Sequence, residues 1–299
     1  MKILLHADDV AGTKYGTIGI MDAWQAGRLD GFSVFANGDA MDEFQTRLAR
    51  CPNEARIMAH LNLSEGPSSA AAETVPLLVD EKGELKHGFG SLLVSWMTGS
   101  SSNRRKLEIQ IENEWRAQIK GVADAISPRQ LSGVDGHIHI HMLPFLFPIA
   151  ARLANEFSLG SIRVTREPFH RATNEHGNAL LPKAFNVFKH LILRACAKSA
   201  TAVAIKHGLH FPARVVGVLY SGAMTKAAAL SAISLSEKEA AADIELIFHV
   251  GRATPEEIGR WSGRQAIAEF NIASARDLES KELVELHAAL VAKGKRNGI

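Results

Sequence analysis

The sequence predicts an α/β fold built on a parallel sheet, either as a barrel or as a doubly wound sheet. Short apolar runs of strand length alternate with longer segments of helical periodicity. This β-α-β-α order implies right-handed crossovers between parallel strands. The chain has 299 residues, 46% hydrophobic and 22% charged, a length that fits one large domain or two smaller ones without disulfide support. Of these, we expect residues 1–299 to form a single domain.

Seven segments have the length and apolar character of strands, and the segments between them have the periodicity of helices. The helix expected from residue 103 carries an apolar stripe that includes Leu107, Ile111 and Trp115, as in a helix that covers a sheet. The expected strands are 2–7, 33–37, 56–63, 131–140, 161–165, 214–220 and 244–249, and the expected helices are 16–27, 42–49, 103–125, 144–157 and 225–234.

Residues 167–212 are longer than a simple connection, so we expect a helical insertion there. Within it, the segment 182–207 mixes apolar residues with basic ones such as Lys189, Arg194 and Lys198. One interpretation is a helix packed on the barrel with a solvated basic edge. The alternative is a lid or a membrane-facing surface, since basic amphipathic helices bind anionic interfaces.

Composition excludes several function classes. The 34 Lys and Arg balance 32 Asp and Glu, for a net charge of +2, which gives no reason to expect a nucleic-acid partner. Cys51 and Cys196 lie far apart, so neither a disulfide framework nor a cysteine zinc site is indicated. Without a signal-peptide core or a membrane span, we expect a cytoplasmic protein, peripheral to the inner membrane face at most. The oligomeric state stays open, and a homo-oligomer is one candidate.

Polar residues follow the expected strands at their carboxyl ends, which line the functional face of parallel α/β folds. Asp8 and Asp9 end the first strand, His60 lies in the third, and His249 ends the last. Adjacent carboxylates point to opposite sides of a continuing strand, so Asp8 and Asp9 share a site only if the chain turns there. A helix cap is the alternative for the aspartates, and a structural role is the alternative for His60.

The fourth strand ends in Asp135, followed by His137, His139 and His141. At period two, the three imidazoles would face one side of an extended strand. Imidazoles together with carboxylates are ligands for Zn, Ni, Cu, Fe or Co as well as for harder ions. We therefore expect a mononuclear hydrolytic metal site.

Three further motifs give weaker indications of function. Arg166 and Glu167 end the fifth strand, where they could bind an anion or a sugar hydroxyl or form a salt bridge. Ser221-Gly222 lacks the nucleophile elbow of serine hydrolases, and neither cysteine has a nucleophile context. Covalent catalysis is disfavoured.

Three motifs in register resemble the YdjC-like carbohydrate deacetylases: Ala7-Asp8-Asp9, HLNLSEGP at 60–67 and DGHIHIHMLP at 135–144. The resemblance continues through 166–168, 221–225 and 245–249, and the later portion looks most like the hopanoid-biosynthesis-associated branch. It implies a distorted (β/α) barrel related to the NodB-type polysaccharide deacetylases. It also implies a hydrolase that removes an acetyl group from an N-acetylated sugar, as an oligosaccharide or a lipid-linked glycan, with a metal-activated water.

The resemblance implies roles for individual residues. A divalent metal, zinc or magnesium, would be held by Asp9, His60 and His137. Asp8 would be the general base and His249 the general acid. The remaining candidates would lie behind the ligands or around the substrate; they are Asp135, His139, His141, Arg166 and Glu167.

The chain departs from the family pattern at two places. Family members usually have Phe-Gly after Ala-Asp-Asp, where this chain has Val10-Ala11, and His-Pro where it has His249-Val250. Every implied ligand and proton-transfer residue is retained, so we expect activity with an altered substrate fit. Two alternatives are a barrel metallohydrolase of the amidohydrolase type and a catalytically silent sugar- or glycolipid-binding protein.

Overall fold

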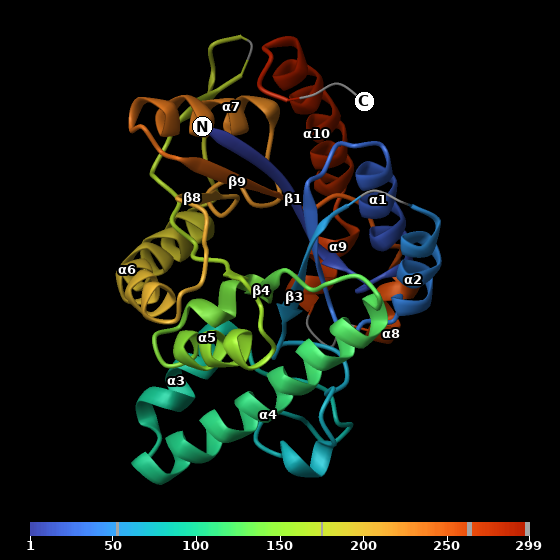
Figure 1. Ribbon diagram of the computed structural model, residues 1–299, viewed down its shortest axis with the longest axis vertical. Helices are drawn as coiled ribbons and strands as arrows, with labels where there is room; N and C mark the ends of the chain where they lie inside the picture. Colours follow the sequence, from blue (N-terminus) through green and yellow to red (C-terminus); the bar gives the residue numbers. More distant parts are fainter. Residues whose placement is uncertain (52–53, 175, 262–264, 297–299) are drawn as a thin grey trace.

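The computed structural model describes residues 1–51, 54–174, 176–261 and 265–296. Its core is a seven-stranded parallel sheet in the order β5-β4-β3-β2-β1-β9-β8 (Figure 1). Each strand lies in one of the seven predicted segments or overlaps it. The strands are β1 Lys2–Val10, β2 Gly31–Val34, β3 Arg56–Leu61, β4 Gly133–Gly136, β5 Ser161–Ile162, β8 Arg214–Val216 and β9 Asp243–Phe248.

The sheet curls until its two edges meet. Ser161 of β5 forms a parallel bridge with His210, which lies just before β8. The N–H of Ile162 donates to the carbonyl of His210, and the N–H of His210 donates to the carbonyl of Gly160. The expected distorted barrel is therefore confirmed, with a closure made by a few bonds between short strands. Strands buried on both faces explain why the sequence shows continuous apolar runs.

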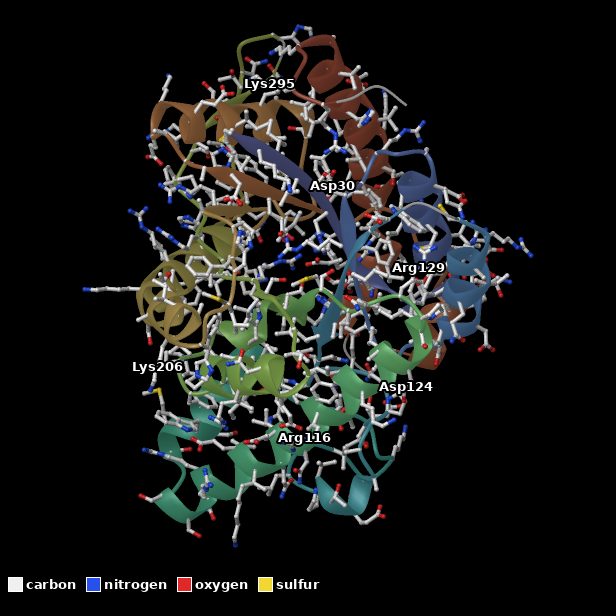
Figure 2. All side chains as sticks on the ribbon, viewed as in Figure 1. Asp30, Arg116, Asp124, Arg129, Lys206 and Lys295 are labelled. Carbon is white, nitrogen blue, oxygen red and sulfur yellow. The ribbon has the colours of Figure 1, made fainter. Side chains whose placement is uncertain are left out.

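Helices cover the outside of this sheet. Figure 1 shows α1 and α2 together on one flank, α6 on the opposite flank, and α3 and α4 at the end furthest from α7 and α10. Figure 2 shows Arg116 on α4, whose guanidinium pairs with Glu156 of α5 at 2.7 Å. The helices are α1 Lys14–Gln25, α2 Met41–Arg50, α3 Phe89–Thr98, α4 Ser101–Ile126, α5 Phe147–Glu156, α6 Ala184–Lys206, α7 Lys226–Lys238, α8 Pro255–Trp261, α9 Gln265–Ile272 and α10 Ala275–Ala292, with short 3-10 helices η1 Ala72–Thr74 and η2 His137–Met142.

The five predicted helices correspond to α1, α2, α4, α5 and α7. The expected insertion holds the hairpin β6 Ala172–Thr173 and β7 Ala179–Leu180, followed by α6. Helices α3, α8, α9 and α10 were not predicted from the sequence. Among the described residues, no helix combines the length and apolar character needed to cross a membrane.

One prediction about the fourth strand is wrong. The strand was expected to continue through 140 with three histidines on one face, but β4 ends at Gly136 and η2 follows. Ile138 and His139 have φ of 48° and 60°, in the left-handed region that side chains rarely adopt. The turn is so tight that a Cβ on Gly136 would lie 2.6 Å from Nδ1 of His141. The three histidines therefore point to different surroundings.

Candidate functional site

The two aspartates at the end of β1 are separated by a local break in the strand. The pairing of β1 with β2 shifts register between Ala7 and Val10, and Asp9 has φ 74°. Backbone strain of this kind occurs at functional sites, where the surroundings hold it in place. Its effect here is that Asp8 and Asp9 contact different groups, although they are neighbours in the chain.

Asp9 lies with His60 and His137 in what we call the open group. Oδ1 of Asp9 is 3.5 Å from Nε2 of His60 and 3.2 Å from Nδ1 of His137. One donor atom from each residue lies within 4.8 Å of the others. The side chains of Asp9 and His137 remain 11% and 9% exposed, so the group is reachable from outside. Two imidazoles and one carboxylate form a donor set for a divalent metal.

Charges around the open group favour an ionised Asp9. Burial alone would raise the pKa of Asp9, but hydrogen bonds with His137 and His60 and the charge of Arg276 lower it well below its ordinary value. Burial would likewise lower the pKa of His60, but the carboxylate of Asp135 raises it to about 10. Before a metal binds, therefore, the carboxylates around His60 favour the protonated form of its imidazole.

Asp135 lies behind His60 and fixes its ring. Oδ1 of Asp135 is 2.7 Å from Nδ1 of His60, which leaves Nε2 directed toward Asp9. A carboxylate on the far nitrogen of a histidine orients the ring and raises its basicity as a ligand. The other oxygen of Asp135 accepts hydrogen bonds from Ser33 and Arg163.

A second cluster, which we call the closed group, consists of His6, Asp8 and Asp135. Its donor atoms also lie within 4.8 Å of one another. Here, however, Arg163 is fully buried among the carboxylates. Its two terminal nitrogens donate to the two oxygens of Asp8 at 2.9 Å, and Nη1 also lies 2.7 Å from Asp135. Nε of Arg163 donates to Glu245 at 2.8 Å. The guanidinium is the cation of this group.

Helix α10 brings two charged side chains to the site from the far end of the chain. Nη2 of Arg276 donates to Oδ2 of Asp9 at 2.8 Å, which leaves Oδ1 facing the histidines. Glu279 accepts the backbone N–H of His249 at 2.7 Å, and its Oε2 lies 3.7 Å from Nδ1 of the same residue. Because Ala7 pairs with Phe248, His249 follows β9 directly beside the aspartates of β1.

The other candidate residues lie in the walls around these groups. His139 contacts Thr165, with Nδ1 3.0 Å from its hydroxyl, and Nε2 of His141 lies 2.9 Å from the carbonyl of Arg163. Glu167 accepts the backbone N–H groups of Val218 and Leu219, which anchors the loop after β8.

Arg166 is half-buried next to Glu167. Helix α6 brings a further cation, Lys189, close to the site. Burial lowers the pKa of Lys189 to about 8, although the charges of Asp8, Asp9 and Glu167 oppose that shift.

A comparison with protein families shows to which family the chain belongs. The family model described as YdjC-like protein matches residues 2–290. The chain belongs to the YdjC-like protein family.

Relatives of this YdjC-like chain carry sugar-deacetylase names. It is 28% identical over 158 residues to a carbohydrate deacetylase of Brevibacillus brevis, covering 52% of this chain and 57% of the relative. A chitooligosaccharide deacetylase of Citrobacter koseri is 27% identical over 165 residues, covering 55% and 60%. A carbohydrate deacetylase of Mus musculus is 28% identical over 225 residues, covering 74% and 67%. The matches thus span about three fifths of the length of the bacterial relatives.

A solved structure has the same fold. A protein of Enterococcus faecalis V583, described as a cellobiose-phosphate cleavage protein, aligns with a TM-score of 0.67 over 98% of this chain and 95% of its own. The two sequences are 20% identical. This likeness concerns the architecture and not the reaction.

Four charged residues at the site of this YdjC-like protein were not singled out from the sequence: Glu65, Arg163, Arg276 and Glu279. Arg163 had a detectable signal, since it places a charge between the apolar Ile162 and Val164 of a predicted strand. Arg276 and Glu279 also had one, because they occupy the stripe of α10 that continues through Leu283 and Leu290 into the core. A charge on the apolar stripe of a helix needs a buried partner.

Proposed function

We propose that this protein is a divalent-metal-dependent hydrolase that removes the acetyl group of an N-acetylated sugar. The observation that carries the proposal is the open group, a reachable cluster of two imidazoles and a carboxylate beside Asp8. The names of the relatives supply the substrate class. Amide hydrolysis needs an activated water, a proton acceptor and a proton donor, and each has a candidate here.

The donor set fits a divalent metal. Asp9, His60 and His137 would hold the ion, and their three donor atoms leave coordination positions for water and substrate, as catalytic sites require. When bound, the ion lowers the pKa of water and polarises the acetyl carbonyl. Two imidazoles suit Zn²⁺, while the carboxylate also suits Mg²⁺, so the two ions are the candidates.

The protein's own residues supply the proton transfers. Asp8 is the proposed general base, and its bidentate contact with Arg163 holds its carboxylate in one orientation. Each oxygen keeps a second lone pair with which to take the proton of the attacking water. When the C–N bond breaks, the amine nitrogen needs a proton, and His249 is the proposed donor. Glu279 lies on the Nδ1 side of His249, which leaves Nε2 for this transfer.

We further propose that α6 makes a peripheral contact with the cytoplasmic face of the inner membrane, where it would admit a lipid-linked sugar. Large apolar side chains on and before α6 are exposed: Leu181 by 86%, Phe185 by 72%, Phe188 by 62% and Leu191 by 57%. The helix carries no acidic residue. Figure 2 shows the basic Lys206 at its end, on the outer side of the molecule. Apolar burial and basic charge together favour anionic interfaces.

Co-sedimentation with liposomes tests this contact. We expect binding to anionic vesicles and weak binding to neutral ones, and loss of binding when Phe185 and Phe188 are replaced by Ser. If the protein stays in the supernatant with both vesicle types, α6 is a structural helix only.

Acetate release tests the activity. The panel contains N-acetylglucosamine oligomers, a nucleotide sugar and a lipid-linked acetamido sugar, each with and without a chelator. We expect release from at least one sugar, its loss with the chelator, and recovery with Zn²⁺ or Mg²⁺. A protein that binds sugar and metal but releases no acetate would be a silent binding protein, contrary to the proposal.

A further inference from the structure

Glu65 is a buried carboxylate that the proposed chemistry leaves without a role. Its side chain is 0% exposed, and Oε1 lies 2.8 Å from Nε2 of His137. Within the described part of the chain, neither oxygen of Glu65 has an aligned hydrogen bond. A buried carboxylate without a partner is strongly disfavoured, so its approach to His137 requires a physical reason.

The loop after β3 fixes the position of Glu65. The backbone carbonyl of Glu65 accepts hydrogen bonds from the side-chain amides of Asn37, at 3.0 Å, and Asn62, at 2.7 Å. Oδ1 of Asn62 accepts the N–H of Ser64, and Gly66 turns the chain with φ 75°. The carboxylate is therefore held beside His137 by its own loop, as a preorganised partner.

The two ring nitrogens of His137 face different acids. Nε2 faces Glu65, whereas Nδ1 lies 3.2 Å from Oδ1 of Asp9. Glu65 lies outside the set of residues whose donor atoms are mutually within 4.8 Å. A histidine that ligates a metal keeps one proton, and the partner of the other nitrogen decides which nitrogen that is.

We propose that Glu65 is a positioning residue that accepts the Nε2 proton of His137 and leaves Nδ1 as the metal-binding nitrogen. His60 is held the opposite way, since its Nδ1 faces Asp135 and its Nε2 faces Asp9. The two histidines would therefore bind through different nitrogens, each with a buried carboxylate behind it. This inference rests on the proposed metal site.

The direct test is NMR of the ¹⁵N-histidine-labelled protein loaded with ¹¹³Cd²⁺, which couples only to the nitrogens that bind it. We expect coupling to Nδ1 of His137 and to Nε2 of His60. Coupling to Nε2 of His137 would overturn the role of Glu65 while leaving the metal site intact. If no cadmium binds at all, the metal site itself fails, and the inference fails with it.

Cadmium affinity of variants gives a second readout. Glu65→Met removes the carboxylate at similar volume, and we expect affinity to fall about 10- to 100-fold, as for other partners of metal-binding histidines. Glu65→Gln keeps an acceptor oxygen, so it should lose less affinity and keep the coupling to Nδ1. Glu73→Gln, an exposed glutamate in the same loop region, is the matched control and should be unchanged.

An affinity of Glu65→Met within about twofold of the unaltered protein would contradict the proposal. If this variant does not fold, the cadmium coupling of the unaltered protein and of Glu65→Gln still decides.

Discussion

The open and closed groups are two clusters of similar composition that lie next to each other but are completed differently. Each has three residues with donor atoms close enough for a metal ion, and Asp135 links them by contacting both His60 and Arg163. In the closed group, the guanidinium of Arg163 is already bonded to Asp8 and Asp135. In the open group, Arg276 reaches only the far oxygen of Asp9.

The difference shows that geometry alone does not identify a metal site. Carboxylates and imidazoles lie close together in both groups. The closed group, however, has a built-in cation and is more deeply buried, with the side chains of His6 and Asp8 exposed by 2% and 6%. Burial lowers the pKa of His6 to about 4, so that imidazole stays neutral beside Arg163. On our proposal, Arg163 and its partners in the closed group hold Asp8 in place, and the open group holds the exchangeable cation.

The largest effect is expected from removal of the built-in cation. Arg163→Met leaves buried carboxylates without a partner, and we expect the free energy of unfolding to fall by about 3–5 kcal/mol. Arg152→Met is the control, because Arg152 pairs with Glu112 at the surface, where a pair contributes about 1 kcal/mol or less. Urea denaturation measures both. Equal losses for the two variants would show that Arg163 is not the structural cation.

Acid should lower the free energy of unfolding by protonating Glu245, which pairs with Arg163 beside the closed group. Arg163 and Arg56 overcome the effect of burial and lower the pKa of Glu245 from 4.5 to about 2. Because the folded pKa lies below the unfolded one, this stabilisation is present above pH 4.5 and is lost as pH falls toward 2. The shift corresponds to roughly 3 kcal/mol.

Urea denaturation of the unaltered protein and of Glu245→Gln across pH 2–7 checks this dependence. The variant should be less stable at pH 7 and should lose less stability in acid. Parallel curves for the two proteins would refute the assignment.

Asp8 and Asp9 should have different functions, with Asp8 needed for turnover and Asp9 for metal binding. Asp8→Asn should keep the metal but reduce turnover by about 10²-fold or more, the usual effect of losing a general base. Acetate release and elemental analysis on the same sample measure both properties. A near-normal rate would restrict Asp8 to holding Arg163.

The smallest effect is expected at His139. Because its Nδ1 contacts Thr165 and not the open group, His139→Gln should retain one equivalent of metal. Loss of one such contact should lower stability by about 1 kcal/mol. Elemental analysis and thermal unfolding check this, and loss of metal would place His139 among the ligands.

The alternation of apolar runs and helices was enough to predict the sheet, because each parallel strand is buried on both faces and reads as an apolar run. Local pattern could not predict where β4 ends. The turn at Ile138 and His139 depends on contacts with a distant strand segment, because His139 contacts the hydroxyl of Thr165 and His141 contacts the carbonyl of Arg163. The periodicity of α10 was present in the sequence, but nothing local connects it to β1.

The candidate site was partly predictable because the parallel sheet was predictable. The carboxyl ends of neighbouring parallel strands meet at one edge, which brings Asp9, His60 and His137 together as expected from the motifs. The charges that complete the site come from distant segments. Arg276 is 267 positions from Asp9, and only the folded chain brings them to 2.8 Å.

The central claim is that the open group binds one divalent cation and that the closed group binds none. Elemental analysis of three proteins tests it most directly: the unaltered chain, the triple variant Asp9→Ala, His60→Ala, His137→Ala, and His6→Ala as a control in the closed group. We expect one equivalent of metal in the first and third and none in the second. A triple variant that still holds one equivalent would contradict the account.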